Sequence, residues 1–152
     1  MGDRTFLWIE CRPEDVEKVS DALWDGTSQA DEVEEQPNGL VRLEDFDANY
    51  GLACERESLA KGGVPFVGGH GSGCEYGDAL FAAVDGEHHD VPSTIDGVPV
   101  VGVLPDGSVC EGDLKAVRAY LDAYNRALRA MGVDPDTHER LTPAPAGEAV
   151  PA

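Results

Sequence analysis

Positive charge is scarce in this chain of 152 residues. Only 11 lysines and arginines stand against 30 aspartates and glutamates, and the formal net charge at pH 7 is −19. Such a field repels nucleic acid, free phosphates and anionic membranes, whereas it attracts basic surfaces. The composition therefore predicts a basic protein partner and argues against direct binding of nucleic acid or of a membrane.

Long hydrophobic runs are missing as well. No apolar segment approaches the ~18–20 residues that cross a bilayer, and Glu10 ends the short apolar stretch Phe6–Ile9, so the start of the chain does not resemble a signal peptide. No two cysteines form a C-x-x-C pair, and we expect reduced thiols, most of them buried. The cysteines are Cys11, Cys54, Cys74 and Cys110. These absences favour a cytoplasmic protein.

The hydrophobic patterns predict a single α+β domain over residues 3–132, followed by a flexible tail rich in proline and alanine over 133–152. We expect an antiparallel or mixed sheet packed against two to three helices. The predicted strands cover Arg4–Cys11, two arms within Asp31–Asp47, Val64–Val67, Ala79–Val84, Glu87–Val91 and Val98–Leu104. Pro65 predicts an edge position for the strand that contains it, and the apolar run at Val98–Leu104 predicts a buried strand.

A long amphipathic helix over Asp113–Met131 is the clearest predicted element. Its apolar residues follow one another at alternating steps of three and four, and Leu121 lies in the middle of this stripe. We therefore expect Leu121 to be buried. Asp113 and Gly132 have the residue types that cap a helix at its two ends.

The acidic excess lies in the first three quarters of the chain. Residues 115–152 hold five acidic and five basic residues, so residues 1–114 hold the other 25 acidic and 6 basic ones. Carboxylates gather in a predicted helix after Pro13 and in the hairpin over Asp31–Asp47. The candidate partner-binding residues are Glu14, Glu17, Asp21, Asp31, Glu32, Glu34, Glu35, Glu44, Asp45 and Asp47.

A dense array of carboxylates on a folded scaffold can imitate a phosphate backbone and occupy a nucleic-acid-binding groove. Inhibitors of restriction and CRISPR nucleases from phages and mobile elements often work in this way, and the chain is similar to them in size and charge only. We expect a non-enzymatic interaction protein without a cofactor, one form of which is a nucleic-acid-mimicking inhibitor of a nuclease or defence complex. The composition also fits a GC-rich or salt-adapted organism, in which an acidic surface serves only solubility.

The glycine-rich segment Gly68–Gly77 suggests an alternative. His70 and Cys74 lie in it, and His88 and His89 follow in the next predicted hairpin. These residue types bind zinc, so the alternative is a small metal-binding protein or metal-dependent enzyme. Adjacent residues of a strand point to opposite faces, so only one of His88 and His89 can join such a site, and no motif spacing supports it. The five glycines of the segment also predict positive φ angles at several positions.

Overall fold

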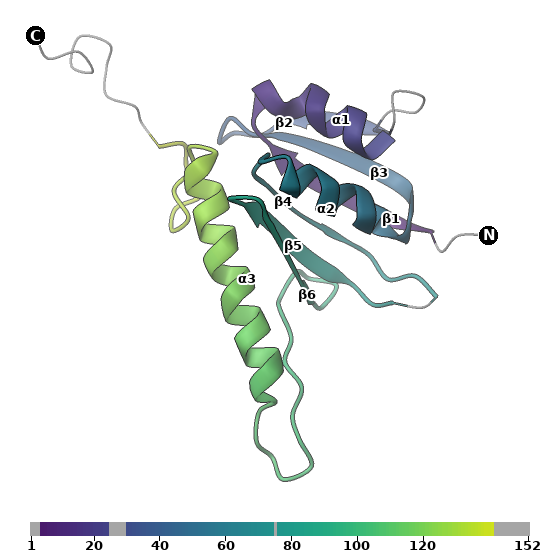
Figure 1. Ribbon diagram of the computed structural model, residues 1–152, viewed down its shortest axis with the longest axis vertical. Coiled ribbons are helices and arrows are strands. Elements are labelled where there is room, and N and C mark those ends of the chain that lie inside the picture. Colours follow the sequence, from purple (N-terminus) through teal and green to yellow (C-terminus); the bar gives the residue numbers. More distant parts are fainter. Residues whose placement is uncertain (1–3, 25–29, 75, 142–152) are drawn as a thin grey trace, which may run out of the picture.

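The computed structural model describes residues 4–24, 30–74 and 76–141 (Figure 1). Within these residues, six strands form one antiparallel sheet in the order β2-β3-β1-β4-β5-β6. The strands are β1 (Arg4–Cys11), β2 (Glu32–Glu35), β3 (Val41–Asn49), β4 (Phe66–His70), β5 (Ala79–Val84) and β6 (Glu87–Pro92). The helices are α1 (Val16–Trp24), α2 (Ala53–Lys61) and α3 (Glu111–Ala130), and single 3-10 turns lie at Pro13–Asp15 and Tyr50–Leu52.

The first four strands and two helices follow one another as β-α-β-β-α-β, with strand order β2-β3-β1-β4. This is the split arrangement of the ferredoxin-like topology. β5 and β6 extend the sheet beyond β4, and α3 packs on the opposite face from α1 and α2 (Figure 1). The expected α+β fold with an antiparallel sheet and a long C-terminal helix is confirmed, but this topology by itself implies no function.

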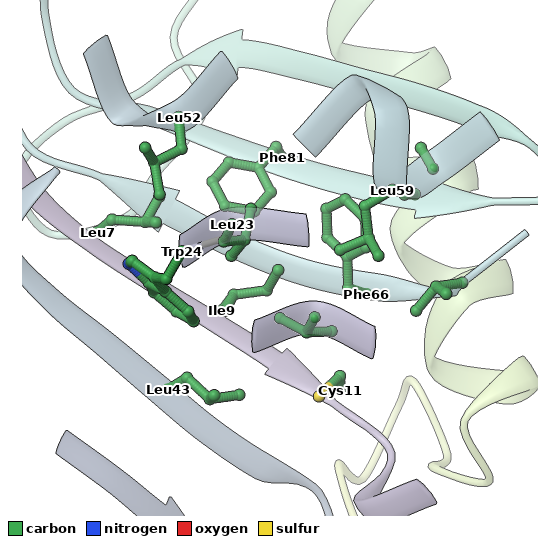
Figure 2. Packing of buried hydrophobic residues seen from close by; sticks show 14 of the residues in the cluster. Leu7, Ile9, Cys11, Leu23, Trp24, Leu43, Leu52, Leu59, Phe66 and Phe81 are labelled. Atoms are coloured by element: carbon green, nitrogen blue, oxygen red, sulfur yellow. The ribbon is translucent and has the colours of Figure 1, made fainter. Parts of the chain in front are cut away.

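One hydrophobic cluster lies on each face of the sheet. Alternate β1 residues, Leu7 and Ile9, are fully buried in the first cluster, beneath α1 and α2 (Figure 2). Phe66 and Phe81, from β4 and β5, meet edge to face in the same cluster with 5.9 Å between ring centroids. Because side chains alternate along a strand, the neighbouring residues face the other side of the sheet. There α3 builds the second cluster over β4, β5 and β6.

The helix α3 faces the sheet with part of the predicted stripe, since Val117, Tyr124, Leu128 and Met131 belong to the second cluster or pack against it. Ala123 and Ala127 are fully buried against the sheet, whereas Leu121 is 43% exposed, so the prediction of a buried Leu121 is wrong. Small side chains let a helix approach a sheet closely, and a pattern based on large apolar residues overlooks them. The helix begins at Glu111, so the prediction of Asp113 as its N-terminal cap is wrong. The Asp113 carboxylate instead accepts a hydrogen bond from the backbone N–H of Gly102 at 2.8 Å.

Two leucines of α3 therefore differ sharply in what they contribute to stability. Leu128→Ala should lower the free energy of unfolding by about 2–5 kcal/mol, because Leu128 is 2% exposed in the second cluster. Leu121→Ala should change it by less than about 0.5 kcal/mol, as expected for a surface position. Urea denaturation of both variants measures the difference, and equal costs would contradict the orientation of α3.

Two predicted strands are placed differently in the structure. Pro65 precedes β4 rather than interrupting it, so β4 is a central strand paired to both β1 and β5, and the prediction of an edge strand is wrong. The segment Val98–Leu104 is no buried strand either. It joins two tight turns at Gly97 and Gly107 and runs beside the N-terminal half of α3, beyond the end of the sheet (Figure 1). Val103 is 67% exposed there.

The folded part continues past residue 132. Val133 is fully buried in the second cluster and forms an isolated antiparallel bridge with Arg140. Leu141 is the last described residue, and the rest of the predicted tail lies outside the described residues. The cysteines are free thiols, but only Cys11 is buried, so the expectation that most of them are buried is wrong.

The glycine-rich segment serves close packing and not turn geometry. Gly68, Gly69, Gly71 and Gly77 have no positive φ, so the prediction made for them is wrong. Gly68 and Gly69 lie in β4 instead. A Cβ on Gly68 would stand 2.6 Å from ring atoms of Phe81, and one on Gly69 would stand 2.8 Å from the indole Nε1 of Trp8. Each glycine thus leaves space for an aromatic ring, on opposite faces of the sheet.

Candidate functional site

Among the described residues, half of one sheet face carries no helix. The second cluster, under α3, draws its strand residues from β4, β5 and β6, so no described helix covers β2, β3 and β1 on that side. We call this half the open face. It presents the residues that alternate with the buried ones of β1 and β3, together with their partners on β2. These residues are Phe6, Trp8, Glu10, Glu32, Glu34, Arg42, Glu44 and Phe46.

Aromatic rings lie at one end of the open face. Phe6 and Phe46 stack with 6.0 Å between centroids and 22° between planes, and they remain 38% and 53% exposed. Trp8 lies over Gly69, and the guanidinium carbon of Arg42 stands 4.4 Å from the centre of its ring. Exposed aromatic rings of this kind are typical of binding surfaces, because a folded chain gains nothing by leaving them in water.

Carboxylates border these rings. Oε1 of Glu44 lies 2.8 Å from Nε of Arg42, and Oε1 of Glu10 lies 3.7 Å from Nη1 of the same arginine. Burial raises the pKa of Glu10 despite this arginine. Glu32 and Glu34 stand directly opposite Glu44 and Arg42 in the ladder between β2 and β3. Since Arg42 is already paired twice, the exposed carboxylates of β2 leave this border acidic.

A groove of about 700 Å³ runs along the open face. Phe6, Trp8 and Phe46 line one side, and the turn that contains Ile95 lines the other. Ile95 is 86% exposed, more than any other large hydrophobic residue recorded in the described part of the chain. The charged residues in the lining of the groove are Arg4, Arg42, Asp78 and Asp96, and the glutamates of β2 lie outside it.

The predicted partner-binding carboxylates do not share one surface. Glu32, Glu34 and Glu44 lie on the open face, whereas Glu14, Glu17 and Asp21 belong to the Pro13–Asp15 turn and to α1, across the sheet. Glu35 is paired to Val41, whose side chain enters the first cluster, so it also points to the far side. Sequence alone could not separate these groups, because the separation follows from strand pairing.

The remaining three candidates have structural partners. Asp31 accepts a hydrogen bond from the backbone N–H of Phe46 at 2.7 Å. Asp45 accepts one from the Trp24 indole at 2.8 Å, and Asp47 lies 3.5 Å from Arg4. These contacts fix the bent end of β3, next to the irregularity that turns Phe46 toward Phe6.

The histidines and the cysteine of the alternative hypothesis are not assembled into a metal site in the described residues. Among them, no three histidine, cysteine or acidic side chains are placed to hold a metal ion. His70 Nδ1 donates to the carbonyl of Gly71, and His89 pairs with Glu87. Cys74 is exposed. The metal interpretation thus has no geometric support in this part of the chain.

His88 instead contacts a buried arginine. Its Nε2 lies 2.8 Å from Nη1 of Arg56 and must accept the hydrogen bond, because a guanidinium only donates. Burial, and next the charge of Arg56, lower the pKa of His88 to about 4. The folded protein therefore favours the neutral ring.

This shifted pKa makes stability depend on pH. The unfolded chain binds a proton at His88 near the ordinary pKa of 6.5 and the folded one near 4, so stability falls as pH drops through that interval. Full exclusion from water would make the loss about 3 kcal/mol, and partial solvent contact reduces it to about 1–2 kcal/mol. Denaturation of wild type and His88→Gln between pH 7 and 4 measures it; parallel pH curves would contradict the assignment.

The aromatic residues of the open face are what the sequence-based list of site residues missed. Phe6 and Trp8 alternate with the apolar Leu7 and Ile9, so this stretch of the strand is typical of one that is buried on both faces. They are recognised as exposed only in the structure, where no described helix covers this half of the sheet.

In the described part of the chain no helix is both long and apolar enough to traverse a membrane. The chain matches no protein-family model, no curated protein and no solved structure.

Proposed function

We propose that this chain is a non-enzymatic interaction protein whose open face docks a basic segment of a partner protein. The observation that carries the proposal is that the exposed pair of Phe6 and Phe46 shares one half of a sheet face with the carboxylates of Glu32 and Glu34. Protein-binding surfaces combine exposed aromatic residues with polar ones in this way.

The chemistry of the face specifies the partner. Arginine and lysine side chains bind the faces of aromatic rings and pair with carboxylates. The contact of Arg42 with Trp8 and Glu44 is an example within the face itself. A partner segment rich in arginine can repeat this arrangement across the open face, with the exposed rings and with the carboxylates of β2. An anionic partner meets the net charge of −19.

The carboxylates should act as a group. Residues two apart on a strand are about 7 Å apart, which is within the Debye length of about 8 Å at physiological ionic strength. A single exposed ion pair contributes only ~0–1 kcal/mol. Single substitutions should therefore have small effects on binding, whereas reversal of the cluster should have a large one that depends on salt.

A narrower form of the proposal is that the protein imitates nucleic acid and inhibits a nuclease or defence complex. In that case double-stranded DNA should compete with this chain for the partner's basic groove. We also propose a cytoplasmic location, since the exposed thiols of Cys54 and Cys74 suit a reducing compartment.

A labelled peptide of nine arginines tests the docking site, with fluorescence anisotropy as the measurement. Glu32→Lys with Glu34→Lys should weaken binding by at least about tenfold. The matched control is Glu17→Lys with Asp21→Lys, which changes the net charge equally from α1, across the sheet. This control should weaken binding by less than about threefold, since only long-range attraction is lost.

The variant Phe46→Ala distinguishes a specific docking site from general electrostatic attraction to an acidic surface. It leaves the net charge unchanged and should still weaken peptide binding about fivefold, because the exposed ring no longer offers a face to arginine. Equal effects of the two charge reversals, together with no effect of Phe46→Ala, would show that the acidity only attracts cations in general. Binding that is insensitive to salt would contradict the proposal too.

A further inference from the structure

A second cavity lies across the sheet from the open face. It encloses about 450 Å³ between the N-terminal end of α2 and strands β5 and β6. Its walls include Tyr50, Arg56, His70, Tyr76, Asp78 and Asp90. Neither the carboxylates of β2 nor the aromatic pair of the open face takes part in it, although it shares His70, Asp78 and Ala79 with the groove of that face.

Arg56 is the unusual feature of this cavity. The residue is 1% exposed, yet no described carboxylate forms an ion pair with it. Its Nε donates to the carbonyl of Gly51, its Nη1 donates to His88, and its guanidinium carbon stands 4.1 Å from the centre of the Phe81 ring. Burial lowers the pKa of Arg56 to about 10, so it remains charged at neutral pH.

The hydrogen-bonding capacity of Arg56 is incompletely used. A guanidinium has five N–H donors, and the two described hydrogen bonds occupy two of them. Every fully buried side-chain nitrogen and oxygen among the described residues has a partner. No hydrogen bond of Nη2 is found among the described residues, so this atom is not fully buried, and Arg56 lines the cavity. A buried cation with free donors at a cavity wall is a binding group for a carboxylate.

The backbone beside Arg56 is held in a costly conformation. Tyr50, Gly51 and Leu52 have φ angles of 52°, 59° and 54° and form a left-handed turn. Residues other than glycine pay for this conformation, and it persists where surrounding contacts enforce it, often at ligand sites. Here the turn aims the carbonyl of Gly51 at Arg56 and brings Tyr50 to the cavity.

The other walls supply the opposite charge and an apolar surface. Asp78 and Asp90 line the cavity. His70 donates from Nδ1 to Gly71 and is kept neutral by burial, which lowers its pKa, so its Nε2 is an acceptor. Tyr50 and Tyr76 stand 6.3 Å apart as aromatic walls, with Val91 and Pro92 beside them.

We infer that this cavity binds a free α-amino acid with an aromatic or large apolar side chain. The carboxylate of the ligand would pair with Arg56, its ammonium group with Asp78 or Asp90, and its side chain would lie against the tyrosines. A simple anion fits less well, because it would meet two carboxylates with one arginine. A simple cation leaves the donors of Arg56 unsatisfied. Only a free amino acid carries both charges on one carbon, so a peptide terminus does not satisfy the site.

Calorimetric titration of the full chain with L-phenylalanine tests the inference. Ligands of this size bind with dissociation constants between about 10 μM and a few mM, so a titration to about 10 mM covers the range. 3-Phenylpropionate lacks the ammonium group, phenethylamine lacks the carboxylate and glycine lacks the side chain. Each should bind at least about tenfold more weakly than phenylalanine. Equal binding of any of the three, or no saturable binding of phenylalanine, would overturn the inference.

Variants locate the binding in the cavity. Asp78→Asn with Asp90→Asn should weaken phenylalanine binding at least about tenfold, because the ammonium group loses its partners. Asp122→Asn, on the exposed face of α3, is the matched control and should not change binding. Arg56→Lys should weaken it too, and the aspartate variant keeps the test valid if the lysine variant does not fold. Backbone amide shifts at Ala53, His70 and Gly77 on addition of phenylalanine would support the assignment, and shifts confined to other residues would contradict it.

Discussion

Gly68→Ala should leave the domain poorly folded, with a loss of at least about 3 kcal/mol in the free energy of unfolding. The added Cβ would overlap with the carbonyl oxygen of Trp8 and stand 2.6 Å from two ring atoms of Phe81. Neither the Trp8 backbone nor the Phe81 ring can move away without a large loss of stability. Trp8 belongs to β1, which is paired on both sides, and Phe81 is fully buried. Circular dichroism and urea denaturation would measure the loss.

Gly112→Ala is the matched control for this substitution. A Cβ on Gly112 would meet nothing within 4 Å, and the residue lies in the first turn of α3. Alanine favours a helix over glycine, so this variant should be unchanged or up to about 1 kcal/mol more stable. A Gly68→Ala protein as stable as wild type would show that β4 can move away from β1, contrary to the pairing described.

Local patterns predicted the elements of this fold well where each residue type had one dominant preference. The aromatic and β-branched residues of β1 and the Asn38-Gly39 turn before β3 lead to the structure directly. The order of the strands could not be predicted, because pairing joins residues far apart in the chain. The two glycines of β4 illustrate this: they suggest a loop, and only the Trp8 and Phe81 rings on either side explain why a strand needs them.

The candidate sites were predicted less well for the same reason. Carboxylates can be counted in a sequence, but which of them share a surface depends on which sheet face each strand residue takes. The sequence gives no reason to expect a buried Arg56, since an arginine in a helix is usually solvated. Its burial follows from Phe81, Gly51 and His88, which lie in three other segments of the chain. No pattern in the sequence around Arg56 predicts these contacts.

Phe81→Ala should be among the most damaging single changes, with a loss of about 3–5 kcal/mol. The ring is fully buried and stands within 6 Å, centroid to centroid, of Phe66 and His88. It also carries the guanidinium of Arg56 on its face. Removing the ring leaves a cavity under α2 and takes away the surface that stabilises a desolvated cation.

Phe46→Ala provides the matched comparison, since the same atoms are removed at a position that is 53% exposed. We expect a loss below about 1 kcal/mol there, because the site leaves no closed cavity. Phe81→Leu should fall between the two variants, as it keeps part of the buried volume but no aromatic face for Arg56. The order of the three variants in urea denaturation therefore tests both the core and the support of the buried arginine. If Phe81→Leu were as stable as wild type, the contact between the ring and Arg56 would contribute nothing, and the charge would be held by Gly51 and His88 alone.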